Sequence, residues 1–286
     1  MPYAILQFIS GFLMGASVVL LLLALWQRYK HFILSPSNHR QWTKDQETLQ
    51  GATFDAAGKT VTIHNVRDSH YYPGTNGEEY DVRHHDATYN LDDVERLWFI
   101  ESVFGPLAAH VFFSFEFKDG RCLPISIEIR KRKDVVFGWK ILFRPVELMY
   151  IAATEADVLR TRICDRTDEA VSIFEMRVPK EYIRAVLVDM LTRMDELRER
   201  PVFYDLIAEN CTSLPLWHLR RVWKESKLPL WHHSYLFTAH ASQLLKVVGL
   251  VGEPLSYAKK DVCPVPREDF SRALRRHSQP SHAHTA

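Results

Sequence analysis

One cysteine stands where a helix is expected to begin. Cys211 lies in the segment ENCTSLPLWHL, between Asn210 and the pair Thr212 and Ser213, which are residue types that cap helices. A thiol at a helix N-terminus lies near free backbone N–H groups and the positive end of the helix dipole, so we expect a lowered pKa. The same N–H groups could hold an oxyanion. The alternative is a buried, inert cysteine.

A thiolate nucleophile needs a base that takes and returns protons. His110 is the candidate, because it opens the run HVFFSFEF (110–117). In a strand, the face of His110 is opposite the apolar stripe of that run. The alternative is a structural histidine at the end of a strand.

An orienting carboxylate would complete the set. The run PISIEIR (124–130) follows a turn at Asp119-Gly120, and the two runs together predict a hairpin. This hairpin would place Ser126 and Glu128 on the face of His110. Glu128 is the expected orienting residue, and Ser126 is the second candidate. The alternative for Glu128 is a solvated glutamate paired with Arg130.

Alternating and helical hydrophobic patterns place these residues in an α+β domain, an antiparallel sheet packed on helices. The expected strands are 59–66, 110–117, 124–130, 147–153, 157–164 and 171–178. The expected helices are 91–104, 181–198, one that begins near Cys211, and one within 230–250.

The N-terminal segment predicts a membrane anchor. Residues 1–27 contain no Asp, Glu, Lys or Arg, and the apolar run 4–26 would span about 35 Å as a helix. A cleaved signal peptide fits less well, because no basic residue precedes the run and no small-residue cleavage site follows it. We therefore expect a transmembrane anchor at 1–28, a linker at 29–50, a catalytic domain at 51–275 and a disordered tail at 276–286.

Composition excludes several classes of function. The formal net charge is +1, which gives no electrostatic footprint for nucleic acid. The four cysteines form no CxxC pair and the histidines show no ligand spacing, so no metal is expected. No Gly-rich phosphate loop is present, and no cofactor is expected. A disulfide among Cys122, Cys164 and Cys263 would indicate an exported domain.

Five ordered segments resemble the Lnb N-terminal periplasmic domain family, whose Lnb proteins are lipoprotein N-acylation transferases. They are VTIHNVRD (61–68), AAHVFFSFEFKDGR (108–121), ISIEIRK (125–131), VELMYIAATEADVLRTR (146–162) and PVFYDLIAENCTS (201–213). The resemblance covers roughly residues 50–220. It implies a circularly permuted papain-like fold of the NlpC type, with Cys211 as nucleophile, His110 as base and Glu128 as third residue. Unlike Lnb, this chain has a single predicted membrane helix.

The resemblance implies a membrane-anchored cysteine acyltransferase that moves an acyl group from a lipid ester, through an S-acyl cysteine, to an amine. The expected partners are a membrane lipid or a lipoprotein. The alternatives are a membrane-tethered cysteine hydrolase of the cell envelope, with the same active site, and a non-catalytic scaffold.

The resemblance also implies a location. Basic residues after the apolar run favour a cytoplasmic domain. The family implies a periplasmic one on the bacterial inner membrane. We give the family more weight, because long domains translocate largely regardless of flanking charge.

Overall fold

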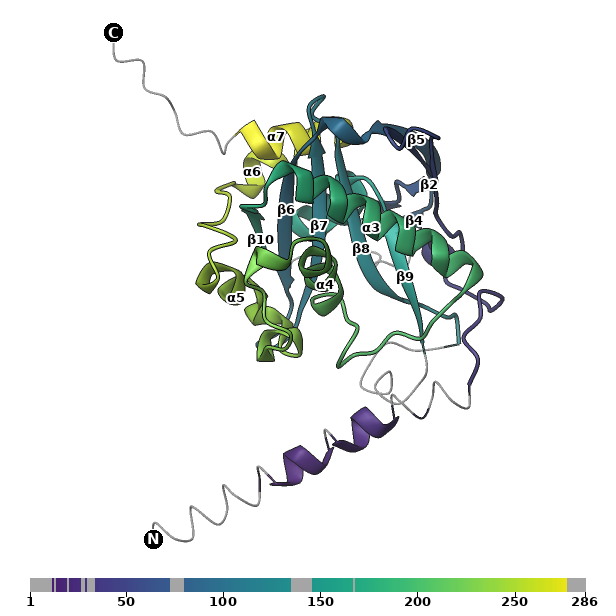
Figure 1. The fold of residues 1–286 in the computed structure, drawn as a ribbon. Helices are drawn as coiled ribbons and strands as arrows, with labels where there is room; N and C mark the ends of the chain where they lie inside the picture. The colour runs from purple at the N-terminus through teal and green to yellow at the C-terminus, as the bar shows by residue number, and fades with distance from the viewer. Residues whose placement is uncertain are drawn as a thin grey trace.

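The computed structural model describes residues 12, 14–19, 21–26, 29, 34–72, 80–134, 146–166 and 168–276. Its centre is a five-stranded antiparallel sheet in the order β10-β6-β7-β8-β9 (Figure 1). These strands are β6 (Val94–Val103), β7 (Ala109–Phe117), β8 (Cys122–Arg130), β9 (Glu147–Ala152) and β10 (Ala170–Glu175). A smaller sheet has the order β1-β2-β5, with β1 (Gly51–Phe54), β2 (Thr60–Arg67) and β5 (His84–Asn90). Strands β3 (His70–Tyr71) and β4 (Tyr80–Asp81) pair with each other.

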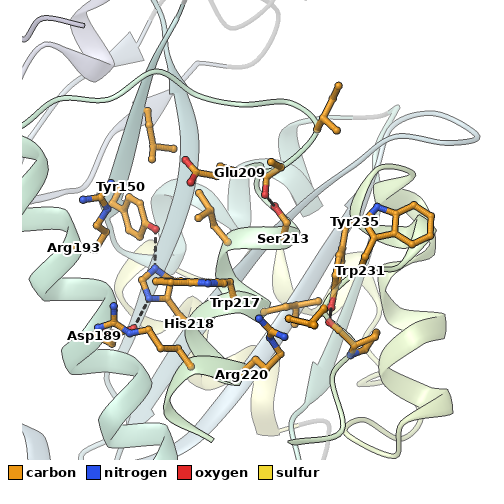
Figure 2. Close-up of a pocket in the computed structure, with 18 of the residues that line it drawn as sticks. Tyr150, Asp189, Arg193, Glu209, Ser213, Trp217, His218, Arg220, Trp231 and Tyr235 are labelled. Atoms are coloured by element: carbon orange, nitrogen blue, oxygen red, sulfur yellow. Dashed lines mark hydrogen bonds and ion pairs between the residues drawn. The ribbon is translucent and has the colours of Figure 1, made fainter. Parts of the chain in front are cut away.

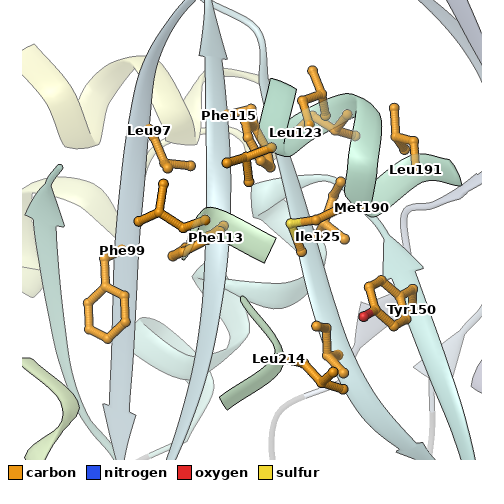
Figure 3. Close-up of a cluster of buried hydrophobic side chains, with 14 of the residues drawn as sticks. Leu97, Phe99, Phe113, Phe115, Leu123, Ile125, Tyr150, Met190, Leu191 and Leu214 are labelled. Carbon is orange, nitrogen blue, oxygen red and sulfur yellow. The ribbon is translucent and has the colours of Figure 1, made fainter. Parts of the chain in front are cut away.

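Helices cover both faces of the large sheet. Helices α3 (Lys180–Glu199) and α4 (Ser213–Val222) cover one face, and their apolar residues meet the inward side chains of β6, β7 and β8 (Figures 1 and 3). Phe99, Phe113 and Ile125 on that face are fully buried. Burying such side chains contributes about 1.5–3 kcal/mol each.

The opposite face packs on shorter helices. These are α2 (Glu155–Val158), α6 (Lys259–Val262) and α7 (Phe270–Arg276). The remaining helix, α5 (Ala241–Val247), comes between α4 and α6 in the sequence. Phe112 and Ile151 of the sheet join Val158, Phe270 and Leu274 in a second apolar cluster. The predicted α+β class, with an antiparallel sheet packed on helices, is confirmed.

Two predicted elements are wrong. The expected helix 91–104 is the strand β6, preceded by one 3-10 turn that Asn90 caps. Because β6 is a central strand covered on both faces, its continuous apolar run lacks the alternation that identifies a half-buried strand. The expected strand 157–164 is α2, capped by Thr154, followed by a π-helical turn at Thr161–Asp165.

The expected linker 29–50 is in part a packed segment of the domain. Trp42 and Gln46 are buried. Arg130 of β8 donates to the carbonyl oxygens of Gln46 and Glu47, and its guanidinium lies 4.1 Å from the centre of the Trp42 ring. Arg130 is thereby occupied by this segment instead of by Glu128.

Most of the expected anchor 1–28 lies outside the described residues. Those described within it, 12, 14–19 and 21–26, are helical. Within the described part of the chain, no helix has the length and apolar character needed to cross a membrane. The expected disordered tail falls almost wholly outside the described residues, since α7 ends at Arg276.

Candidate active site

Cys211 lies in the turn that leads into α4, two residues before the helix begins at Ser213, so the predicted helix near Cys211 is present. The Asn210 side-chain oxygen accepts from the backbone N–H groups of Thr212 and Ser213, at 2.9 Å each. The Ser213 hydroxyl in turn accepts from the N–H of Asn210 at 2.9 Å. This reciprocal pair is a capping box. Asn210 therefore caps the turn of Cys211 and Thr212 that leads into α4.

The start of α4 fits against an open edge of β7. The β7–β8 ladder ends at the pair Phe112–Ser126, although β7 begins three residues earlier. The Thr238 hydroxyl binds both the N–H and the carbonyl of Ala109. The thiol of Cys211 lies 3.8 Å from the same carbonyl and also interacts with the N–H of Val111. The Cys211 thiol therefore lies beside the backbone on either side of His110.

The three predicted polar residues of the hairpin form one hydrogen-bonded chain. His110 Nε2 lies 2.7 Å from Ser126 Oγ, and Ser126 donates to Glu128 Oε1 at 3.0 Å. The direct distance from His110 Nε2 to Glu128 Oε1 is 3.8 Å. Ser126, the second candidate, is thus the direct partner of the histidine. Because Ser126 uses Nε2, Nδ1 is the nitrogen left to exchange a proton with a thiol.

Burial and neighbouring charges determine the charge states of His110 and Glu128. Burial, together with the neighbouring Arg162, lowers the pKa of His110 to about 3, so the imidazole is neutral near pH 7. Burial opposes ionisation of Glu128, but His110 and Arg67 outweigh it and lower the pKa to about 2. Gln46 donates a further hydrogen bond to Glu128 at 3.1 Å. The arrangement is a neutral base held by an ionised carboxylate through one hydroxyl.

The expected low pKa of Cys211 is not found. Burial raises the pKa of the thiol above its ordinary value, against hydrogen bonds from Val111 and Tyr204. The expected free N–H groups are also absent around Cys211. Those of Thr212 and Ser213 bind the Asn210 cap, and that of Cys211 donates to the Tyr204 hydroxyl at 2.9 Å. The N–H groups expected to stabilise a thiolate are thus already bound by the side chains of Asn210 and Tyr204.

A cavity of about 410 Å³ gives access to these groups. Cys211, His110 and Glu128 all line it. Phe104 and Leu107 of the β6–β7 loop, both more than half exposed, are also lining residues. Polar lining residues include Tyr204 and Arg162. The cavity is of the size that holds small organic ligands.

Sequence reasoning missed Tyr204 and Arg162. Tyr204 precedes Cys211 by seven residues, in a stretch without periodicity, so no spacing rule connects its hydroxyl to the thiol. Arg162 stood in a predicted strand, and only the π-helical turn turns it toward the cavity. Such π-helical turns are frequent at functional sites, but no sequence pattern predicts them.

The model of the Lnb N-terminal periplasmic domain matches residues 80–241, which include His110, Ser126, Glu128 and Cys211. The chain belongs to the Lnb N-terminal periplasmic domain family. The suspected family is therefore confirmed. No curated protein and no solved structure matches the chain.

The family places this Lnb-type domain in the periplasm, as the domain of a membrane protein. The cysteines agree with that location. Cys164 and Cys263 form a disulfide, while Cys122 and Cys211 are free thiols. Disulfides persist in oxidising compartments and are rare in the cytosol. Cys211, the candidate nucleophile, is thus outside the disulfide.

A second cavity, of about 470 Å³, lies behind the start of α4 (Figure 2). His218 of α4 joins Tyr150 of β9 and Asp189 of α3, with 2.7 Å to each partner. Burial lowers the pKa of this histidine and raises the pKa of Tyr150. Neither free cysteine lines this cavity. The three residues join three elements of the Lnb-type domain and are not the predicted site.

Proposed function

We propose that this protein is a cysteine acyltransferase of the cell envelope, with a permuted papain-like active site. The single observation that supports the proposal best is the placement of Cys211. It lies in the capped turn before α4, beside the strand of His110, whose Nε2 is bound by Ser126 and, through Ser126, linked to Glu128. In chain order, the histidine strand precedes the cysteine helix, as the permuted fold requires. No protein cofactor or metal is part of the proposal.

The first half-reaction forms the acyl-enzyme. His110 takes the thiol proton on Nδ1 as Cys211 Sγ bonds to the carbonyl carbon of a lipid ester. The ester C–O bond breaks, and the imidazolium returns the proton to the leaving alkoxide, so charge and atoms balance. The ionised Glu128, acting through Ser126, stabilises the transient imidazolium. The products are an S-acyl cysteine and a lipid alcohol.

The second half-reaction consumes the thioester. A neutral amine attacks the thioester carbon, a C–N bond forms, and the C–S bond breaks. His110 takes a proton from the amine and delivers it to the departing thiolate, which restores the resting thiol. In each half-reaction the Tyr204 hydroxyl, which borders the thiol, is the candidate donor to the carbonyl oxygen as its negative charge develops.

Removal of the nucleophile tests the proposal. The protein is incubated with membrane lipids, and intact-mass analysis is expected to show one acyl group on the wild-type chain and none on Cys211→Ala. Cys122→Ala is the matched control, since it removes the other free thiol. It is expected to keep the adduct.

The acceptor is then supplied as a peptide with an N-terminal diacylglyceryl cysteine. An N-acyl product is expected. Release of free fatty acid alone would instead identify a hydrolase. Full transfer by Cys211→Ala would contradict the proposal.

A further inference from the structure

The π-helical turn Thr161–Asp165 forms part of the wall of the catalytic cavity. Thr161, Arg162 and Arg166 all line the cavity with Cys211. The turn is fixed from behind, because its Cys164 is bonded to Cys263 in the segment that leads to α7. A cationic wall is therefore held rigidly beside the nucleophile.

Among the residues that the structure describes, two donor atoms of this wall have no hydrogen-bond partner. Thr161 is 3 % exposed, and its buried hydroxyl is unsatisfied. The buried Nε of Arg162 is also unsatisfied, since Glu169 Oε2 lies 3.7 Å away, beyond hydrogen-bond distance. An unsatisfied buried polar group costs about 1–3 kcal/mol. Both residues line the cavity, so a bound water or ligand could complete these two donors after a small adjustment of the side chains.

The charges of the wall are also incompletely matched. Arg162 and Arg166 share one carboxylate, Glu169, which lies 2.5 Å from Arg166. The guanidinium of Arg162 is 11 % exposed, and Arg166 disfavours its charge further by repulsion. The nearby Glu128 already binds Ser126 and Gln46. An anion at the wall would relieve the repulsion between the two arginines.

We infer that Arg162, Arg166 and Thr161 form a phosphate subsite, and that the acyl donor is a glycerophospholipid whose phosphodiester binds there. This inference rests on the proposed function and names its substrate class. Two guanidinium groups and a hydroxyl offer several donors in different directions, which suits a phosphate better than a planar carboxylate. Phe104 and Leu107, on another element of the same cavity, offer an apolar surface for an acyl chain.

Binding is measured separately from chemistry. The Cys211→Ala protein cannot form the thioester, so calorimetry reports binding alone. The probes are dihexanoylphosphatidylglycerol, dihexanoylglycerol and inorganic phosphate. We expect the phospholipid to bind about tenfold or more tightly than the neutral glyceride, because one charge-assisted hydrogen bond contributes at least that factor. Inorganic phosphate is expected to compete with the phospholipid.

Variants locate the subsite. In the Cys211→Ala background, Arg162→Gln is expected to weaken phospholipid binding about tenfold and to leave dihexanoylglycerol binding unchanged. Arg272→Gln removes a positive charge from a side chain that is 59 % exposed on α7, and it is expected to change neither. If Arg162→Gln does not fold, Arg166→Gln, whose side chain is 41 % exposed, takes its place. Equal binding of both lipids to the parent protein would overturn the inference, as would undiminished phospholipid binding by the folded variant.

A second readout separates the inference from the proposed function. Equal acylation of Cys211 in the wild-type protein by the phospholipid and the neutral glyceride would support the acyltransferase function and contradict the phosphate subsite. If neither lipid acylates Cys211 but the phospholipid binds in an Arg162-dependent way, the result would support the phosphate subsite and contradict the acyltransferase function. Binding of a carboxylated cell-wall peptide in preference to the phospholipid would also overturn the inference.

Discussion

At the scale of single residues, the sequence predicted the participants of the site better than their state. Residue type and strand alternation brought His110, Ser126 and Glu128 to one face, and the structure links all three. The state of Cys211 was predicted wrongly, because the helix dipole was considered without burial. In a cavity wall, loss of solvation outweighs the partial charges of a helix end.

The rate of alkylation should report the raised pKa of Cys211. We expect iodoacetamide to modify the native protein slowly at pH 7, with a rate that rises about tenfold per pH unit up to pH 9, since only the thiolate reacts. His110, with a pKa of about 3, is neutral throughout this range and adds no inflection. The site of modification is read by peptide mass spectrometry.

Tyr204→Phe serves as the control for this profile. It removes the hydroxyl that binds the thiol, so the thiolate fraction and the rate are expected to fall at each pH below 9. A wild-type rate that is already constant from pH 7 upward would show a thiolate at neutral pH. That result would contradict the raised pKa.

At the scale of elements, the capping residues predicted the start of α4, but the sequence did not predict that β6 is a strand buried on both faces. The residues Asn210 to Ser213 announced a helix start correctly. The segment 91–104 did not reveal a strand, because burial on both faces removes the alternation on which the distinction depends. The type of element was predicted wrongly for residues 91–104 and 157–164, because packing against the rest of the domain, and not the local pattern, determines their structure.

The capping box makes a prediction about α4. Asn210→Ala removes the acceptor for two N–H groups and is expected to lower the free energy of unfolding by about 1–2 kcal/mol, measured by urea denaturation. It is also expected to slow S-acylation, because the first turn positions Cys211. Asn90→Ala removes the cap of the 3-10 turn before β6, which binds a single N–H, and Asn90 does not line the cavity, so this variant should leave S-acylation unchanged. Equal acylation rates for the two variants would disprove the positioning role of the cap.

At the scale of the whole molecule, five spaced segments sufficed to predict the family, and the matched region 80–241 confirms it. The boundary of the domain was predicted less well. Residues 38–47 bind Arg130 through carbonyl oxygens and one stacked tryptophan. Contacts of that kind leave no periodic pattern, so the segment resembled a polar linker.

The disulfide makes a prediction about global stability. It closes a loop with a sequence separation of 99 residues, and its loss is expected to cost about 3–5 kcal/mol of unfolding free energy. Cys164→Ser should therefore lower the urea midpoint strongly, and dithiothreitol should do the same to the wild type. Cys122→Ser keeps the bond and should leave the midpoint nearly unchanged. A wild-type midpoint that dithiothreitol does not move would show that the bond is absent or makes no contribution.

The order of the cysteines along the chain also bears on how the protein matures. During export, Cys122 would emerge first, followed by Cys164, Cys211 and Cys263. An oxidant that joins thiols in their order of appearance would pair Cys122 with Cys164 and Cys211 with Cys263, which would block the candidate nucleophile. The correct bond skips Cys211, so maturation requires either that α4 packs before oxidation or that an isomerase reshuffles the first pairing. Secretion in a host without periplasmic disulfide isomerase should therefore yield a mixed population, of which only part has a free Cys211.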